Sequence, residues 1–267
     1  MKHVMITAAV ILGITGSTFA QDGYNPNSFR TVHNSDMMYR KTVWRAMDLR
    51  EKQNLPLFSK NQEITSVILK AFSDGIVQGF TNDSLASKVL WNDLREKLII
   101  PSTRIPVDTT DAFLEYGAEW RKQIAPEVYF TGRDIYQIEI KEEILFDKQR
   151  SVMYRDIQTI TVFIPADHPE NVKGIQETIA TFRYKDLIEH VFTDNPKARW
   201  VSQENDAASK SLNDAFDLSL FSSYIVKVSN GKDQYLSDVY GSEYKGLLAS
   251  QSTAAALMEY EHHLWEY

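Results

Sequence analysis

The feature that most constrains the fold is a pair of long alternating segments, residues 134–146 (DIYQIEIKEEILF) and 151–165 (SVMYRDIQTITVFIP). In both segments apolar residues alternate with polar ones, which is the period of a strand with two different faces. Only four residues, DKQR at 147–150, separate the two segments. Such a short polar connection is typical of a hairpin turn. The sequence therefore predicts one long antiparallel hairpin.

Three more segments have strand character. They are rich in β-branched and aromatic residues, and they cover residues 40–51, 177–184 and 221–231. Together with the hairpin they predict a mainly antiparallel sheet.

Helices are expected before, between and after these strands. Residues 62–74 carry an apolar stripe at helical spacing, with Asn61 placed to cap the start and Gly75 placed to end it. A second helix is expected to open at Asp83 or Ser84 and to stop before Pro101. Shorter helices are predicted over residues 185–192 and 233–240, and the polar stretch 193–211 is predicted to be a loop. The predicted fold class is α+β, with helices bracketing the sheet.

The N-terminus has the pattern of a secretory signal peptide over residues 1–20. A short basic start precedes an apolar run, and small residues then predict cleavage after Ala20. The apolar run is shorter than the roughly 20 residues that a membrane-spanning helix needs. We therefore expect export to the periplasm.

Residues 21–40 lack periodicity, and we interpret them as an extended arm that precedes a single domain over 41–267. The arm wraps its own domain or a neighbour, or it is a frayed terminus. Its apolar anchors are expected to contact a partner, and they are Phe29, Met37, Met38 and Tyr39.

Composition excludes several classes of protein. The chain has no cysteine, which excludes a disulfide-stapled domain and an acylated cysteine anchor. Its formal net charge of −7 disfavours nonspecific binding to nucleic acid or anionic lipid.

The chain also lacks the common catalytic signatures. There is no G-x-S-x-G, glycine-rich phosphate loop, H-E-x-x-H or C-x-x-C pattern. Glu142 and Glu143 are adjacent on a predicted strand, so their side chains should point to opposite faces and cannot act as one pair. We expect no catalytic residues and no cofactor.

The last residues, EYEHHLWEY, raise the question of a metal site. On a helix over 253–267 the apolar side chains form one stripe, and the polar ones fall opposite. The stripe comprises Leu257, Tyr260, Leu264 and Tyr267, broadened by Met258 and Trp265. The opposite face comprises Glu259, His262, His263 and Glu266.

One interpretation of this tail is half of a zinc or di-metal site, since Glu-x-x-His occurs in di-iron bundles. In those bundles the ligands face the core, whereas these would face away from the apolar stripe. We therefore favour a solvated polar face and expect no metal. The apolar stripe predicts docking, with Trp265 and Tyr267 as further partner contacts.

Four segments resemble one protein family. They are KTVWRAMDLREKQNLPLF (41–58), DGIVQGF (74–80), FDKQRSVMYRDI (146–157) and EHHLWEY (261–267). In this order they are similar to the GldN/PorN family of the Bacteroidetes, which serves gliding motility and type IX secretion. The resemblance spans nearly the whole chain after the signal peptide. A longer charged insertion in the middle of other members has no counterpart in this sequence.

The resemblance implies a non-enzymatic periplasmic subunit. It would assemble with an outer-membrane lipoprotein, and with copies of itself, into a ring of the secretion machinery. The lipoprotein would hold it at the outer membrane. The alternative from the residues alone is a periplasmic hydrolase or a glycan-binding module that uses surface aromatic side chains.

Overall fold

A seven-stranded sheet runs through the computed structural model, which describes residues 27–103, 127–193, 195–203, 205 and 207–265. The strand order is β3-β2-β6-β5-β4-β1-β9, and all neighbours pair antiparallel. The strands are β1 (Met37–Asp48), β2 (Gly79–Phe80), β3 (Lys88–Val89), β4 (Gln137–Asp147), β5 (Val152–Ile164), β6 (Glu177–Arg183) and β9 (Tyr224–Val228).

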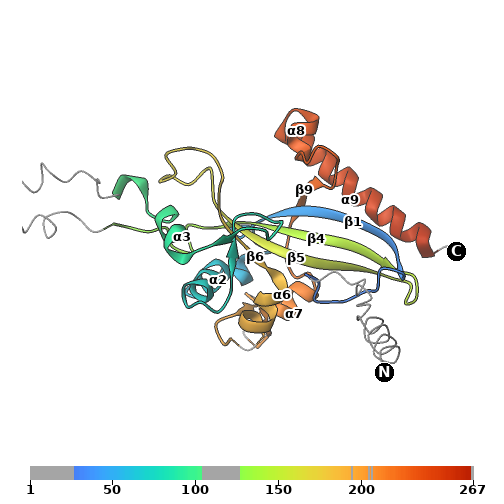
Figure 1. Ribbon diagram of the computed structural model, residues 1–267, viewed down its shortest axis with the longest axis horizontal. Helices are drawn as coiled ribbons and strands as arrows, with labels where there is room; N and C mark the ends of the chain where they lie inside the picture. The colour runs from blue at the N-terminus through green and yellow to red at the C-terminus, as the bar shows by residue number, and fades with distance from the viewer. Residues whose placement is uncertain (1–26, 104–126, 194, 204, 206, 266–267) are drawn as a thin grey trace, which may run out of the picture.

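Helical segments cover parts of this sheet. Figure 1 shows α2, α6 and α7 gathered on one side and the long α9 running beside β1. The helical segments are η1 (Leu55–Leu57), α2 (Ile64–Ser73), α3 (Trp91–Lys97), η2 (Pro101–Thr103), α6 (Tyr184–Leu187), the π-helical η4 (Ile188–Phe192), α7 (Leu212–Asp217), α8 (Leu236–Tyr240) and α9 (Glu243–Trp265). Mixed helices and an antiparallel sheet confirm the predicted α+β class.

The predicted hairpin is the centre of the sheet. β4 and β5 pair from Gln137 opposite Phe163 to Asp147 opposite Val152, and β1 pairs with β4 over its whole length. The register shifts once, where Gln158 is an extra residue on β5. A bulge of this kind increases the local twist of the strands. We call the turn end of the hairpin distal and the opposite end proximal.

The main core lies at the proximal end. Ile138 and Ile140 alternate on one face of β4, where they join the buried Phe182 of β6 and the apolar stripe of α2. Phe72 of α2 meets the Phe182 ring edge-on, with the ring centroids 5.6 Å apart. Each of these large side chains is almost fully buried, so this end supplies most of the hydrophobic stabilisation.

A second, smaller cluster lies on the same strands at the distal end. Val43, Ile144 and Ile225 are buried there, and Leu257 of α9 packs against them. Ile138, Ile140 and Ile144 occupy even-numbered positions of one regular strand, so both clusters are on one sheet face. We call it the inner face.

The extended arm predicted over 21–40 is shorter in the structure. β1 begins at Met37, so the last four residues of that segment belong to the sheet. The reason is that β4 extends far enough to pair with them, for example at Arg40 opposite Leu145. Residues 21–26 and the signal peptide lie outside the described residues.

Local helix boundaries also differ from expectation. The helix predicted from Asp83 starts at Trp91, because the residues before it form the short strands β2 and β3. α2 begins after Glu63 instead of Asn61, while Gly75 does end it with a left-handed φ of 73°. α9 starts at Glu243, ten residues before the predicted start.

The predicted loop over 193–211 contains a small hairpin. Its strands, β7 (Arg199–Val201) and β8 (Ser209–Ser211), are only three residues long, and β8 is polar throughout. Strands this short leave no alternating pattern to detect.

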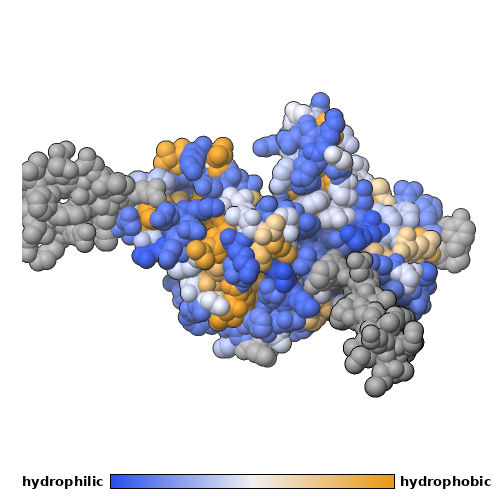
Figure 2. Space-filling view, viewed as in Figure 1, coloured by the Kyte–Doolittle hydropathy of each residue, from blue (hydrophilic) through white to orange (hydrophobic). Residues whose placement is uncertain are grey.

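The face in Figure 2 is mainly hydrophilic, with apolar colour over the loop between β5 and β6. Val172 and Ile175 are exposed in that loop. None of the helices in the described part of the chain is long and apolar enough to span a bilayer.

Candidate docking groove

A groove of about 540 Å³ opens over the distal inner face. Its floor comes from β1, β4, β5 and β9, one wall from α9, and the other from α6, η4 and α7. The apolar part of its floor includes Ile144, Met153 and Ile225. We call it the distal groove. It exists because the helices that cover the proximal core do not extend to the hairpin turn.

A buried ion pair crosses the floor of the distal groove. Glu142 lies between Ile140 and Ile144 on the inner face of β4, at a position where the alternation puts an apolar residue. The residue is only 2% exposed, and its Oε1 accepts no hydrogen bond from the described residues. Arg45 Nη1 of β1 lies 3.5 Å from that oxygen.

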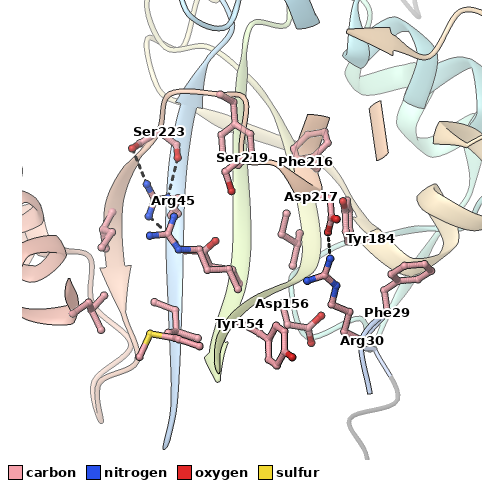
Figure 3. Close-up of a pocket in the computed structure, with 18 of the residues that line it drawn as sticks. Phe29, Arg30, Arg45, Tyr154, Asp156, Tyr184, Phe216, Asp217, Ser219 and Ser223 are labelled. Carbon is pink, nitrogen blue, oxygen red and sulfur yellow. Dashed lines mark hydrogen bonds and ion pairs between the residues drawn. The ribbon is translucent and has the colours of Figure 1, made fainter. Parts of the chain in front are cut away.

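Burial opposes the charge on both partners of this pair. It raises the pKa of Glu142, although Arg45 and Arg155 favour the ionised carboxylate. It also lowers the pKa of Arg45. Figure 3 shows how Arg45 is held: its guanidinium donates from Nε to Ser223 Oγ at 2.9 Å and from Nη2 to the Ser223 carbonyl at 3.0 Å.

The N-terminal residues form the open rim of the groove. We call Ser28–Val32 the strap. Its Arg30 is paired with Asp217 of α7 and lies over the ring of Tyr154 on β5 (Figure 3). Phe29, an expected partner contact, lines the groove with 47% of its surface exposed.

The other expected contacts are more scattered. Met37, Met38 and Tyr39 belong to β1 instead of a free arm, and Met38 is 62% exposed. Tyr39 packs on Tyr260 of α9, with ring centroids 4.4 Å apart. The side chain of Trp265 and all of Tyr267 lie outside the described part of the chain. The structure thus brings Phe29 alone of the described set to the groove.

The terminal helix has the orientation that its sequence predicts. Leu257 faces the second cluster, while His262 and His263 are exposed on the other side. His263 Nε2 lies 3.8 Å from Glu259 Oε1, one turn away. Within the described residues, no three His, Asp or Glu side chains are grouped so that they could hold a metal ion.

The carboxylates near the groove do not form a catalytic pair. Glu143 pairs with Arg40, whereas Glu142 pairs with Arg45, so the two glutamates point to opposite faces as predicted. Asp156 is opposite Glu143 and therefore also points away from Glu142. Burial raises the pKa of Asp156 to about 6. The groove combines apolar side chains with charged ones of both signs, so it can bind a ligand by shape and charge.

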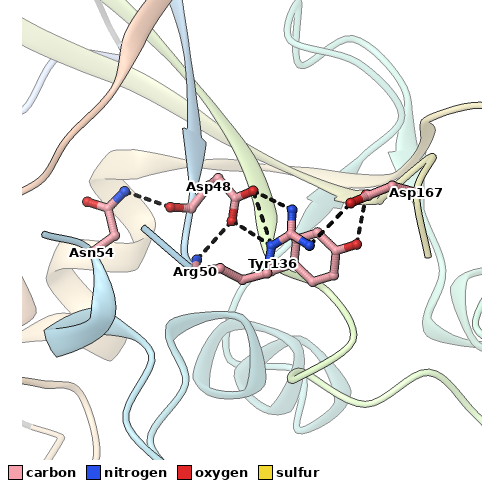
Figure 4. A network of polar contacts seen from close by, with 5 residues as sticks. All are labelled: Asp48, Arg50, Asn54, Tyr136 and Asp167. Atoms are coloured by element: carbon pink, nitrogen blue, oxygen red, sulfur yellow. Dashed lines mark hydrogen bonds and ion pairs between the residues drawn. The ribbon is translucent and has the colours of Figure 1, made fainter. Parts of the chain in front are cut away.

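A polar clasp fixes the proximal end of β1 (Figure 4). Arg50 donates from Nε to Asp48 Oδ1 and from Nη2 to Asp48 Oδ2, donates to Asp167 at 3.2 Å, and stacks its guanidinium 3.7 Å from the centre of the Tyr136 ring. The Tyr136 hydroxyl donates to Asp167 at 2.7 Å. Burial, followed by this hydrogen bond, raises the pKa of Tyr136 to about 12.

The buried Asn54 extends this clasp. Its amide donates to the carbonyls of Asp48 and Ser222, and its oxygen accepts from the Ser222 N–H. The clasp therefore joins β1 to the segment that leads into β9.

A second polar cluster lies on the outer face of the sheet. Lys227 of β9 lies over the Trp44 ring at 4.2 Å and pairs with Asp233 at 2.5 Å. Trp44 Nε1 donates to Asp83 at 2.9 Å. Glu139 is beside them, and burial raises its pKa to about 7.

Sequence reasoning missed the charged members of the groove. Arg45 and Arg155 look like ordinary polar positions of alternating strands. A signal existed at Glu142, because it interrupts the isoleucine alternation of residues 138–144.

A family model described as gliding motility associated protein GldN matches residues 32–266. No curated protein matches the chain. The segment from Lys41 to Phe58, which carries part of the resemblance seen in the sequence, supplies Trp44, Arg45 and the Arg50 clasp.

Proposed function

We infer the function of this chain from one premise: it belongs to the GldN family of gliding motility associated proteins. The family match over 32–266 is the single observation that carries the proposal, because the matched range includes every strand and helix described above.

We propose that the protein is a non-enzymatic structural subunit of the type IX secretion and gliding machinery. It would be exported by its signal peptide and would assemble in the periplasm with an outer-membrane lipoprotein and with copies of itself in a ring. Association with the lipoprotein would keep it at the outer membrane.

Two features of the structure support a binding role. The distal groove offers a concave surface with apolar and charged side chains, as protein interfaces do. Its buried Glu142 is paired with Arg45, which is itself held by Ser223, so this pair serves as a fixed part of the surface.

A deletion strain tests the proposal. We expect loss of gliding and loss of secretion of many cargo proteins, with both restored by the wild-type gene. Affinity purification of the tagged chain at native expression should recover a lipoprotein in a high-molecular-weight assembly.

Intact secretion in the deletion strain, with altered cell-wall products, would support a hydrolase or glycan-binding role instead. Recovery of the chain only as a monomer without a lipoprotein would refute the ring assembly.

A further inference from the structure

The distal half of β5 has an open edge. β6 pairs with β5 only from Thr159 to Ile164, so among the described residues Val152–Ile157 have no strand neighbour on that side. Unpaired strand edges are templates for another strand, and proteins usually cover or charge them. This one is accompanied by the strap.

The strap covers the open edge without pairing to it. Among the described residues, no backbone hydrogen bond joins Ser28–Val32 to β5. The contacts are made by side chains: Ser28 with Asp156, and Arg30 with Tyr154 and Asp217. Both partners of the Arg30–Asp217 pair are about half exposed, so that pair holds the strap weakly.

Cavities lie on both sides of the strap. The distal groove is on one side, and a cavity of about 340 Å³ is on the other, lined by the strap together with Arg150 and Tyr154. A segment with space on both flanks has few packing contacts to lose when it moves. Ser28 and Val32 are buried and anchor the two ends of the strap, whereas Phe29, Arg30 and Thr31 between them are exposed, so the middle of the strap has the fewest contacts to lose.

The charges along the edge favour an acidic strand. Arg150 and Arg155 are exposed, and among the described residues Arg155 makes no ion pair. The neighbouring carboxylates, Asp147 and Asp156, are buried and hydrogen-bonded within the hairpin. The exposed charge on the hairpin beside Val152–Ile157 is thus positive, while Asp217 of α7 is a half-exposed carboxylate paired with Arg30 of the strap.

We propose that Val152–Ile157 is a strand-addition site for an acidic, extended segment of a different protein, which displaces the strap. The backbone of the added strand would complete the ladder of β5. Carboxylates on its inner side would pair with Arg155, which points into the distal groove together with Met153 and Ile157, and with Arg150 at the turn. The inference goes beyond the proposed function, because it rests on these contacts whatever assembly the chain joins.

A synthetic peptide provides the probe: a ten-residue sequence that alternates valine with glutamate, compared with the same peptide carrying glutamine. Hydrogen exchange of the full chain should show new protection of the amides in 152–157 with the acidic peptide. Binding of the glutamine peptide should be about tenfold weaker, because two exposed ion pairs are lost. Protection elsewhere, or equal binding of both peptides, would overturn the proposal.

Locking the strap tests displacement. The chain has no native cysteine, so R30C with D217C gives a unique pair that a short bis-maleimide can bridge. The linked chain should lose peptide binding, whereas the same variant left unlinked should keep it. Equal binding by both forms contradicts displacement. If the bis-maleimide instead joined position 30 of one chain to position 217 of another, the strap would lie on a second copy of the protein. That result would overturn the proposal that the partner is a different protein.

A matched charge control separates the edge from the overall charge. Arg150→Gln with Arg155→Gln should weaken the acidic peptide about tenfold. Lys52→Gln with Lys60→Gln removes the same charge from exposed positions outside the edge and should leave binding unchanged. Equal effects of the two variants would show that the edge is not the site.

Discussion

The two ends of the β4–β5 hairpin share strands and alternation but differ in what covers them. At the proximal end Ile138 and Ile140 are sealed by α2 and by Phe182. At the distal end the cluster around Ile144 is covered by Leu257 of α9 and Leu236 of α8, Glu142 occupies an apolar position, and a groove remains open. One strand can therefore build a core at one end and a binding surface at the other, and helix coverage decides which.

The largest expected effect separates the two ends by stability. Ile140→Ala should lower the free energy of unfolding by about 3–4 kcal/mol, because the fully covered site cannot collapse around the cavity. Ile144→Ala should cost only about 2 kcal/mol, because α9 can shift into the space. Urea denaturation measures the free energy of unfolding of both variants. Equal losses of stability would contradict the difference between the two ends.

The ion pair in the groove gives the next effect. Glu142→Ala should destabilise the chain by about 2–3 kcal/mol, because it leaves the half-buried Arg45 without its partner. Replacing both residues, Arg45→Met with Glu142→Leu, should return the stability to within about 1 kcal/mol of wild type. A double variant as unstable as Glu142→Ala would show that the pair is needed for folding.

The outer face adds a pH-dependent contrast. Glu139 has a folded pKa of about 7 against an ordinary 4.5, so the fold favours its protonated form. The stabilisation that Glu139 contributes is complete at a pH below its ordinary pKa of 4.5. It is lost as the pH rises through the folded pKa of about 7.

Glu139→Gln cannot ionise and avoids this loss. The variant should exceed wild type by about 1–3 kcal/mol at pH 8 and match it at pH 4. Lys227 keeps Asp233 and the Trp44 ring in the variant. Thermal unfolding over this pH range measures the difference, and a constant gap between the curves would contradict the assignment.

The Arg50 clasp should give the smallest effect, and it would act on the proximal end. Arg50→Lys should cost less than about 1 kcal/mol, because Arg50 is half exposed, although lysine cannot donate to both Asp48 oxygens at once. Faster hydrogen exchange around Asp167, without change in the distal groove, is the expected local result. Faster exchange at both ends would mean that the clasp also organises the groove.

The sequence predicted the parts of the fold that leave a periodic pattern. The alternation of 134–165 identified the hairpin, and the stripe of 62–74 identified α2. The position of β1 between β4 and β9 could not be predicted, because strand order depends on contacts between distant residues. The strands of the missed hairpin β7–β8 have only three residues each, which is too short for an alternating pattern to be detected.

The candidate site was less predictable than the fold. Apolar stripe residues of the tail, such as Leu257, were placed on the correct side of α9 by helical spacing. Arg45 and Glu142 meet only because β1 and β4 pair in one register, and neither residue type indicates that a helix is missing above them. The groove exists because the helices leave part of the distal inner face uncovered, and the sequence of one segment does not show which helices will cover it.

The most direct test of the account is whether partners cover the distal groove and leave the proximal side open. Met258 is exposed at the groove, and Lys70 is exposed on α2. Maleimide labelling of M258C and K70C variants would be compared between the free chain and the assembly isolated from cells. We predict that assembly strongly slows labelling of the M258C variant and leaves the K70C variant unchanged. Unchanged labelling of the M258C variant in the assembly would contradict the account.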